Sequence, residues 1–293
     1  MDDFWSHIFN FSDYGELLGL VKNSLIAGAL LGVVGGLIGV FVMQRDLAFA
    51  VHGISELSFA GASAALLFGA NVVAGSALGS LAAAILIGLL GARARERNSV
   101  TAVLMPFGLG LGILFLALYS GRSANKFGLL TGQIVAVEEP QLAVLAVISV
   151  VVIAALMVMW RPLSFASVDP EIARAKGVPT SALSLSFMIL LGLAVAVSIQ
   201  VVGALLVLSL LVTPAAAAMR VSASPLVMPL LSVAFAVTSI VGGILLALGG
   251  GLPISPYVTT ISFVIYLVCR VIGARRQRRG FGRVNPKSVG LAS

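Results

Sequence analysis

The chain has 293 residues, of which 59% are hydrophobic and only 10% are charged, and its mean hydropathy is +1.12. A soluble domain needs far more polar residues to cover its surface, so this composition excludes soluble enzymes, nucleic-acid binders and disordered regulators. The formal charge of +7 does not indicate a nucleic-acid partner, because seven of the 18 Lys and Arg residues lie within 270–287, around the end of the last apolar segment. Such a run is typical of the cytoplasmic flank of a membrane protein, where it also contacts anionic lipid.

The first residues, 1–16, are acidic and aromatic, unlike the basic start of a cleavable signal peptide. We expect them to form a short interfacial segment, because aromatic side chains favour the depth of the lipid headgroups.

Nine apolar stretches have about the 20 residues that a helix needs to cross a bilayer. Helices are expected there, because a helix satisfies its backbone hydrogen bonds within one segment. The predicted fold class is therefore an all-α polytopic membrane protein, a bundle of eight to nine transmembrane helices in a single domain over 1–293. The count stays open because 182–217 can hold two crossings that meet near Ser198–Gln200, or one crossing with a re-entrant piece. The expected spans are 17–43, 47–69, 72–92, 99–119, 141–160, 182–198, 200–217, 225–248 and 257–273.

Basic residues between the spans predict the orientation, because cytoplasmic loops carry an excess of Lys and Arg. With nine crossings, the N-terminus lies outside, and 274–293 forms a basic cytoplasmic tail at the other end. Arg122 and Lys126 then fall outside, as exceptions to the rule. The residues assigned to the cytoplasmic side before the tail are Arg45, Arg93, Arg95, Arg97, Arg161, Arg174 and Lys176.

Small residues recur about every four positions in the first span, a spacing that favours close packing between membrane helices over a direct substrate role. They are Gly28, Gly32, Gly35, Gly36 and Gly39.

The second span contains two ionisable residues, His52 and Glu56, in an otherwise apolar set of spans. A carboxylate at this depth costs on the order of 2–3 kcal/mol by insertion scales, so such residues usually face a polar cavity and mark an ion path. Residues four apart share one helix face, so the imidazole and the carboxylate can converge on one ion. That ligand pair suits zinc or manganese, and Ser55 and Ser58 can hold water or orient the ligands. The alternative is a pair that only hydrogen-bonds within the bundle.

Residues 168–178 predict a short charged helix between two spans. Asp169 can cap it, Pro170 suits its first turn, Glu171 complements its positive end and Gly177 can terminate it. This helix is either an ordinary capped loop or a docking element for a cytoplasmic partner.

The sequence has no G-x-x-x-x-G-K-[ST] phosphate-binding loop, no HExxH and no G-x-S-x-G. We therefore expect no enzymatic activity from this chain, and any ATP hydrolysis belongs to another subunit.

From about residue 20 to 272 the chain resembles the ABC-3 family, the permease subunits of ABC-type zinc and manganese importers. That family carries an Arg after the first long helix, a Leu-Ala pair, and an Asp and a His four apart before a Gly. Here the matching residues are Arg45, Leu47, Ala48, His52, Glu56 and Gly61, so the order of imidazole and carboxylate is reversed. Asp169, Ala173 and Gly177 match a D-x3-A-x3-G pattern of the family, and two further similar stretches are 126–137 and 201–218. A last one is LPISP at 252–256. Gly251 precedes it, where the family often has an acidic residue.

The resemblance implies that His52 and Glu56 bind the metal and that Asp169, Glu171, Ala173 and Gly177 belong to a coupling helix. It also implies a homodimer of permeases in the cell membrane, bound to cytoplasmic ATP-binding subunits and an extracytoplasmic metal-binding protein, with no cofactor of its own. We therefore expect a permease that moves Zn²⁺ or Mn²⁺ inward with ATP consumed by its partner. A proton-coupled secondary transporter is the alternative, and an intramembrane enzyme lacks the nucleophile or metal triad it would need.

Overall fold

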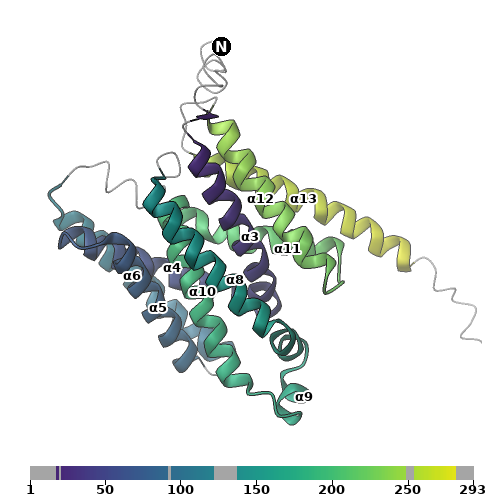
Figure 1. The fold of residues 1–293 in the computed structure, drawn as a ribbon. Helices are drawn as coiled ribbons and strands as arrows, with labels where there is room; N and C mark the ends of the chain where they lie inside the picture. Colours follow the sequence, from purple (N-terminus) through teal and green to yellow (C-terminus); the bar gives the residue numbers. More distant parts are fainter. Residues whose placement is uncertain (1–17, 20, 92–93, 122–136, 249–253, 282–293) are drawn as a thin grey trace, which may run out of the picture.

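The computed structural model describes residues 18–19, 21–91, 94–121, 137–248 and 254–281, and every regular element among them is an α-helix (Figure 1). The expected interfacial segment 1–16, nearly all of the 126–137 stretch and the tail beyond residue 281 lie outside these ranges. The helices are α3 Lys22–Gln44, α4 Ala48–Leu67, α5 Val72–Leu90, α6 Ala94–Leu118, α8 Glu139–Val168, α9 Pro170–Ala175, α10 Thr180–Val202, α11 Ala204–Val221, α12 Val227–Leu248 and α13 Ile254–Phe281.

Eight of the described helices are long and apolar enough to cross a membrane, which confirms the prediction of an all-α polytopic membrane protein. The two exceptions are α9 and α11. Helix α9 has only six residues, and the apolar part of α11, Leu206–Val221, is shorter than the eight candidate spans. The protein is thus a multi-pass membrane protein.

The uncertain region 182–217 forms two separate helices, α10 and α11. They meet at Gly203, which has φ 80° and ψ 160°, a conformation that glycine adopts far more readily than other residues. The expected break near Ser198–Gln200 is therefore displaced by three residues. Hydropathy alone does not locate it, because the sequence stays apolar across the bend.

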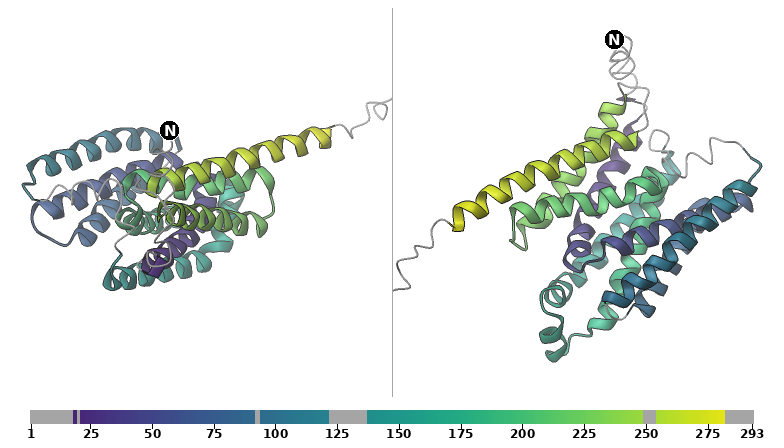
Figure 2. Two further views of the ribbon diagram at one scale, coloured as in Figure 1. Left: turned by 90° about the horizontal axis from the view of Figure 1, so that it is seen from above. Right: turned by 180° about the vertical axis from the view of Figure 1, so that it is seen from behind.

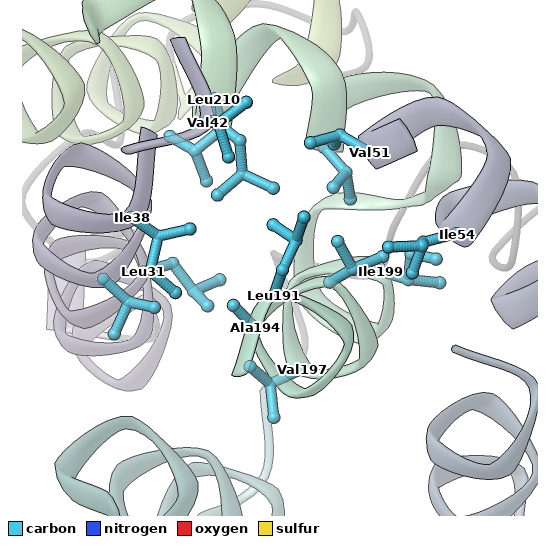
Figure 3. Close-up of a cluster of buried hydrophobic side chains, with 14 of the residues drawn as sticks. Leu31, Ile38, Val42, Val51, Ile54, Leu191, Ala194, Val197, Ile199 and Leu210 are labelled. Carbon is cyan, nitrogen blue, oxygen red and sulfur yellow. The ribbon is translucent and has the colours of Figure 1, made fainter. Parts of the chain in front are cut away.

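Helix α10 connects two groups of helices in the bundle (Figures 1 and 2). On one side α4 packs against α5 and α6, and on the other α3 packs against α11 and α12, with α13 against α11 and α12. Between them α10 contacts helices of both groups as well as α8. Figure 3 shows Leu191 and Ala194 of α10 in a buried cluster with Ile38 of α3 and Ile54 of α4.

Helix α8 runs well past the expected span 141–160 and ends at Val168. It continues through Pro162, although an interior proline removes one helical hydrogen bond. The extension brings α8 directly to Asp169, which ends α8 and also caps α9. In Figure 1 the α9 helix lies at the opposite end of the bundle from the start of α3.

The glycines of α3 serve helix packing, as their spacing predicts. A Cβ at Gly36 would lie 2.5 Å from Val233 Cα and 2.7 Å from Val233 N on α12, so only glycine lets these backbones approach. Ser232 Oγ also donates a hydrogen bond of 2.7 Å to the Gly36 carbonyl oxygen. Among the others, Gly28 and Gly32 face α12, whereas Gly35 and Gly39 face α11.

We expect Gly36→Ala to destabilise the protein by about 1–3 kcal/mol, because the added methyl group forces α3 and α12 apart. Thermal unfolding of the detergent-purified protein measures this as a lower Tm. Gly110→Ala in α6 is the matched control, since a Cβ there meets nothing within 4 Å and alanine raises helix propensity. A Tm for Gly36→Ala equal to or above that of the unaltered protein would contradict this packing.

Candidate metal site

Helix α4, which carries His52 and Glu56, is enclosed by α5, α6, α10 and α11. Close approach to α6 depends on Gly108, where a Cβ would lie 2.7 Å from Leu57 Cδ1 and 3.0 Å from the carbonyl carbon of Glu56. The backbone that bears the carboxylate is therefore held directly against the neighbouring helix. Sequence reasoning missed this contact, because glycine spacing in α6 does not indicate which helix it faces.

The two ionisable side chains face each other along α4, as their four-residue spacing predicts. His52 Nε2 lies 3.7 Å from Glu56 Oε1, and the side chains are 36% and 10% exposed. This separation is too long for a hydrogen bond. Two atoms that each lie about 2.1 Å from one ion at a tetrahedral angle are about 3.4 Å apart. The pair thus needs only a small side-chain adjustment to bind one cation jointly.

Among the residues that the structure describes, the second ring nitrogen of His52, Nδ1, lacks the hydrogen bond that usually supports a metal-bound histidine. In the described part of the chain, Nδ1 is buried and has no hydrogen-bond partner. Metal-ligating histidines commonly donate this second N–H to a carboxylate, carbonyl or water, which fixes the tautomer and the ring orientation. Within the described ranges, the ring therefore depends on Nε2 for its polar contact.

No third protein ligand joins the pair within the described residues, where no group of three or more His, Cys, Asp or Glu side chains could hold a metal. A structural zinc site takes four protein ligands, whereas a site that must release its ion leaves positions for water. What these residues offer is one imidazole and one carboxylate, a combination suited to borderline divalent metals.

The two serines expected to support the ligands are both buried, at 1% exposure for Ser55 and 0% for Ser58. Ser58 Oγ bonds the neighbouring helix instead, because it lies 2.9 Å from the carbonyl oxygen and 2.8 Å from the hydroxyl of Ser76 in α5. Ser76 Oγ in turn donates to the Ala196 carbonyl of α10 at 3.3 Å. Ser58 therefore fixes α4 in the bundle through its contact with α5, while a role of Ser55 or Ser58 in holding water or orienting the ligands stays a prediction.

The predicted charged helix is present as α9, with both ends closed as the sequence indicates. Asp169 Oδ1 accepts hydrogen bonds from the backbone nitrogens of Glu171 at 3.1 Å and Ile172 at 2.9 Å. At the other end Gly177 has φ 82° and donates to the Arg174 carbonyl, while Val178 donates to Ala173, the pattern of a Schellman cap.

Helix α9 is anchored to the bundle through one face. Ala173 is fully buried, and α9 contacts both α8 and α10, whereas Glu171 stays exposed. Asp169, Glu171, Ala173 and Gly177 thus lie together in one short element, apart from the pair on α4.

The model of the ABC 3 transport family matches residues 18–273, nearly the whole length of the chain. The manganese transport system membrane protein MntC of Halalkalibacterium halodurans is 29% identical over 76% of this chain and 77% of its own length. The high-affinity zinc uptake system membrane protein ZnuB of Buchnera aphidicola is 27% identical over 86% of this chain and 97% of its own. Among solved structures, PsaBC from Streptococcus pneumoniae in complex with Fab shares the fold, with a TM-score of 0.79 and 24% identity over 88% of this chain and 95% of that one.

We expect Glu56→Gln to weaken binding of Mn²⁺ and Zn²⁺ by more than about tenfold, because an amide keeps the shape of the side chain but is a neutral ligand. Competition against a metal-sensitive fluorescent chelator, with the detergent-purified protein, measures the affinity. Glu139→Gln, on the exposed first turn of α8, is the matched control and should bind as the unaltered protein does. Equal affinities for all three proteins would remove Glu56 from the site.

Proposed function

This chain belongs to the ABC 3 transport family, and on that basis we propose that it is the membrane permease subunit of an ATP-binding cassette importer for Zn²⁺ or Mn²⁺. The observation that carries the proposal is the His52–Glu56 pair, an imidazole and a carboxylate on one face of a helix long and apolar enough to cross a membrane. Relatives described as manganese and zinc transport proteins support the choice of cargo.

The pair stabilises a divalent cation within a bundle that would otherwise reject it. Glu56 supplies a negative charge, and His52 supplies a nitrogen ligand while it is neutral. Two protein ligands replace only part of the hydration shell of the ion, so water completes the coordination and the ion can leave. This is the balance that a transport site needs, because binding that is too strong would trap the cargo.

Energy for transport comes from a separate cytoplasmic ATP-binding subunit, since the chain has no phosphate-binding loop. Helix α9 docks on that subunit through its exposed face, which includes Glu171, while its buried face at Ala173 holds it to the bundle. Two copies of the permease form the translocating unit, and an extracytoplasmic binding protein delivers the ion. The N-terminus lies outside the cell membrane and the C-terminus lies in the cytoplasm.

A proton-coupled secondary transporter is the less favoured alternative, because the chain belongs to a family of ABC transport proteins. It would use the same two residues but need no ATP-binding partner. The two mechanisms differ in their energy source, so one uptake assay separates them.

In proteoliposomes that contain the permease with its ATP-binding subunit and binding protein, we expect uptake of radiolabelled Mn²⁺ or Zn²⁺ to require ATP. Competition between the two unlabelled metals identifies the preferred cargo. The double variant His52→Ala/Glu56→Ala should lose uptake, because both proposed metal ligands are removed. A proton uncoupler should leave uptake by the unaltered complex unchanged.

Uptake that survives in the double variant would exclude the pair as the transport site. Uptake without ATP that collapses on addition of the uncoupler would instead establish the secondary transporter.

A second prediction concerns the docking helix. Asp169→Ala removes both hydrogen bonds at the start of α9 and costs about 1 kcal/mol of helix stability, so we expect slower uptake and weaker ATPase stimulation with unchanged metal affinity. Asp169→Asn retains an acceptor oxygen and should restore both rates. If Asp169→Ala and Asp169→Asn transport equally well, the cap has no part in coupling.

A further inference from the structure

Arg45 connects five helices at the end of the bundle where α9 lies. It occupies the turn between α3 and α4, and its Nη1 donates to Ser167 Oγ in the last turn of α8 at 3.4 Å. Its guanidinium carbon lies 6.0 Å from the centroid of the Phe187 ring in α10. Its backbone oxygen accepts a hydrogen bond of 3.1 Å from Arg97 Nη2 in α6.

The position of the Arg45 guanidinium disfavours its charge, so neighbouring groups must stabilise that charge. Burial, followed by the nearby Arg97 guanidinium, lowers the pKa of Arg45. An arginine nevertheless keeps its charge in a protein, so the charge must be stabilised where it lies. The Ser167 hydroxyl and the face of the Phe187 ring provide that stabilisation.

The aromatic surface under Arg45 is itself fixed by ring contacts. Phe187 packs edge-to-face against Phe41 of α3, with centroids 6.0 Å apart and an interplanar angle of 65°. Phe41 packs the same way against Trp160 of α8, at 4.8 Å and 80°. Because Phe41 packs against both Phe187 and Trp160, the ring beneath Arg45 is held in place by a second aromatic contact.

Ser167 connects Arg45 to the docking helix. Its hydroxyl donates to the Leu163 carbonyl at 2.6 Å, which orients the oxygen so that it can accept from Arg45. Only Val168 separates Ser167 from Asp169, the residue that ends α8 and caps α9. A displacement of α9 therefore reaches Ser167 through a continuous, hydrogen-bonded backbone.

On the other side, Arg45 connects to the metal ligands through α4. The turn is tight, with Asp46 at φ 54° and a hydrogen bond of 2.8 Å from Leu47 N to the Val42 carbonyl. Helix α4 begins at Ala48, and His52 lies four residues farther, about 6 Å of helix rise. Movement of the turn is thus passed to the ligands by a short, rigid helix.

We propose that Arg45 is a positioning residue for transport, which transmits displacement of α9 to the His52–Glu56 turn of α4. This inference rests on the proposed function, because it assumes that α9 docks on an ATP-binding subunit. Arg45 itself is not assigned any contact with the metal.

The test compares Arg45→Ala with the unaltered complex in the reconstituted system, with Mn²⁺ and Zn²⁺ as probes. Metal ions taken up per ATP hydrolysed should fall by on the order of tenfold, while metal affinity of the purified permease stays unchanged. Arg161→Ala is the matched control, because Arg161 is an exposed arginine of α8 six residues before Ser167, and it should keep the normal ratio.

A role in folding alone would give a different result, namely lower Tm and yield with the normal number of ions per ATP, and that result would overturn the inference. Ser167→Ala removes the hydroxyl acceptor without changing any charge, and it should lower the same ratio. If Arg45→Ala does not assemble, Ser167→Ala decides, and a normal ratio in that variant contradicts the inference. Absence of ATP-driven uptake in the unaltered complex would refute the proposed function instead.

Discussion

The cost of a carboxylate inside an apolar helical bundle is the constraint on which this structure depends. Glu56 is only 10% exposed in its side chain, and its Oε1 lies 3.7 Å from Nε2 of His52 on the same helix. A neutral imidazole does not cancel the carboxylate charge, whereas a divalent cation between the two side chains does. In the proposed function, a bound divalent cation therefore stabilises the site relative to its empty form, and this is the basis of the proposed selectivity for a cation.

In the proposed transport cycle, access to this site changes through movement of whole helices, because α4 is packed closely against its neighbours. Gly108 of α6 lies directly against the Glu56 backbone, and Ser58 is hydrogen-bonded to Ser76 of α5. Packed interfaces of this kind shift between discrete arrangements rather than deform continuously. Arg45, in the turn between α3 and α4, contacts Ser167 close to α9, and this contact is the route by which we propose that α9 acts on the His52–Glu56 pair.

The features that sequence predicts well here are those set within one helix. Four-residue spacing places His52 beside Glu56 in any α-helix, and the capping residues Asp169 and Gly177 define α9 without reference to the rest of the chain. Features that depend on a second helix were missed or misplaced. The break at Gly203 lies in continuous apolar sequence, and the partner of Ser58 is visible only once α5 is in place.

X-ray absorption spectroscopy of the Mn²⁺- or Zn²⁺-loaded complex tests the central claim most directly, because it reports the ligands of the metal rather than transport. The account predicts a shell of nitrogen and oxygen ligands at about 2.0–2.2 Å with the scattering signature of one imidazole, which disappears in His52→Ala. A ligand shell without imidazole, or one that His52→Ala leaves unchanged, would contradict it.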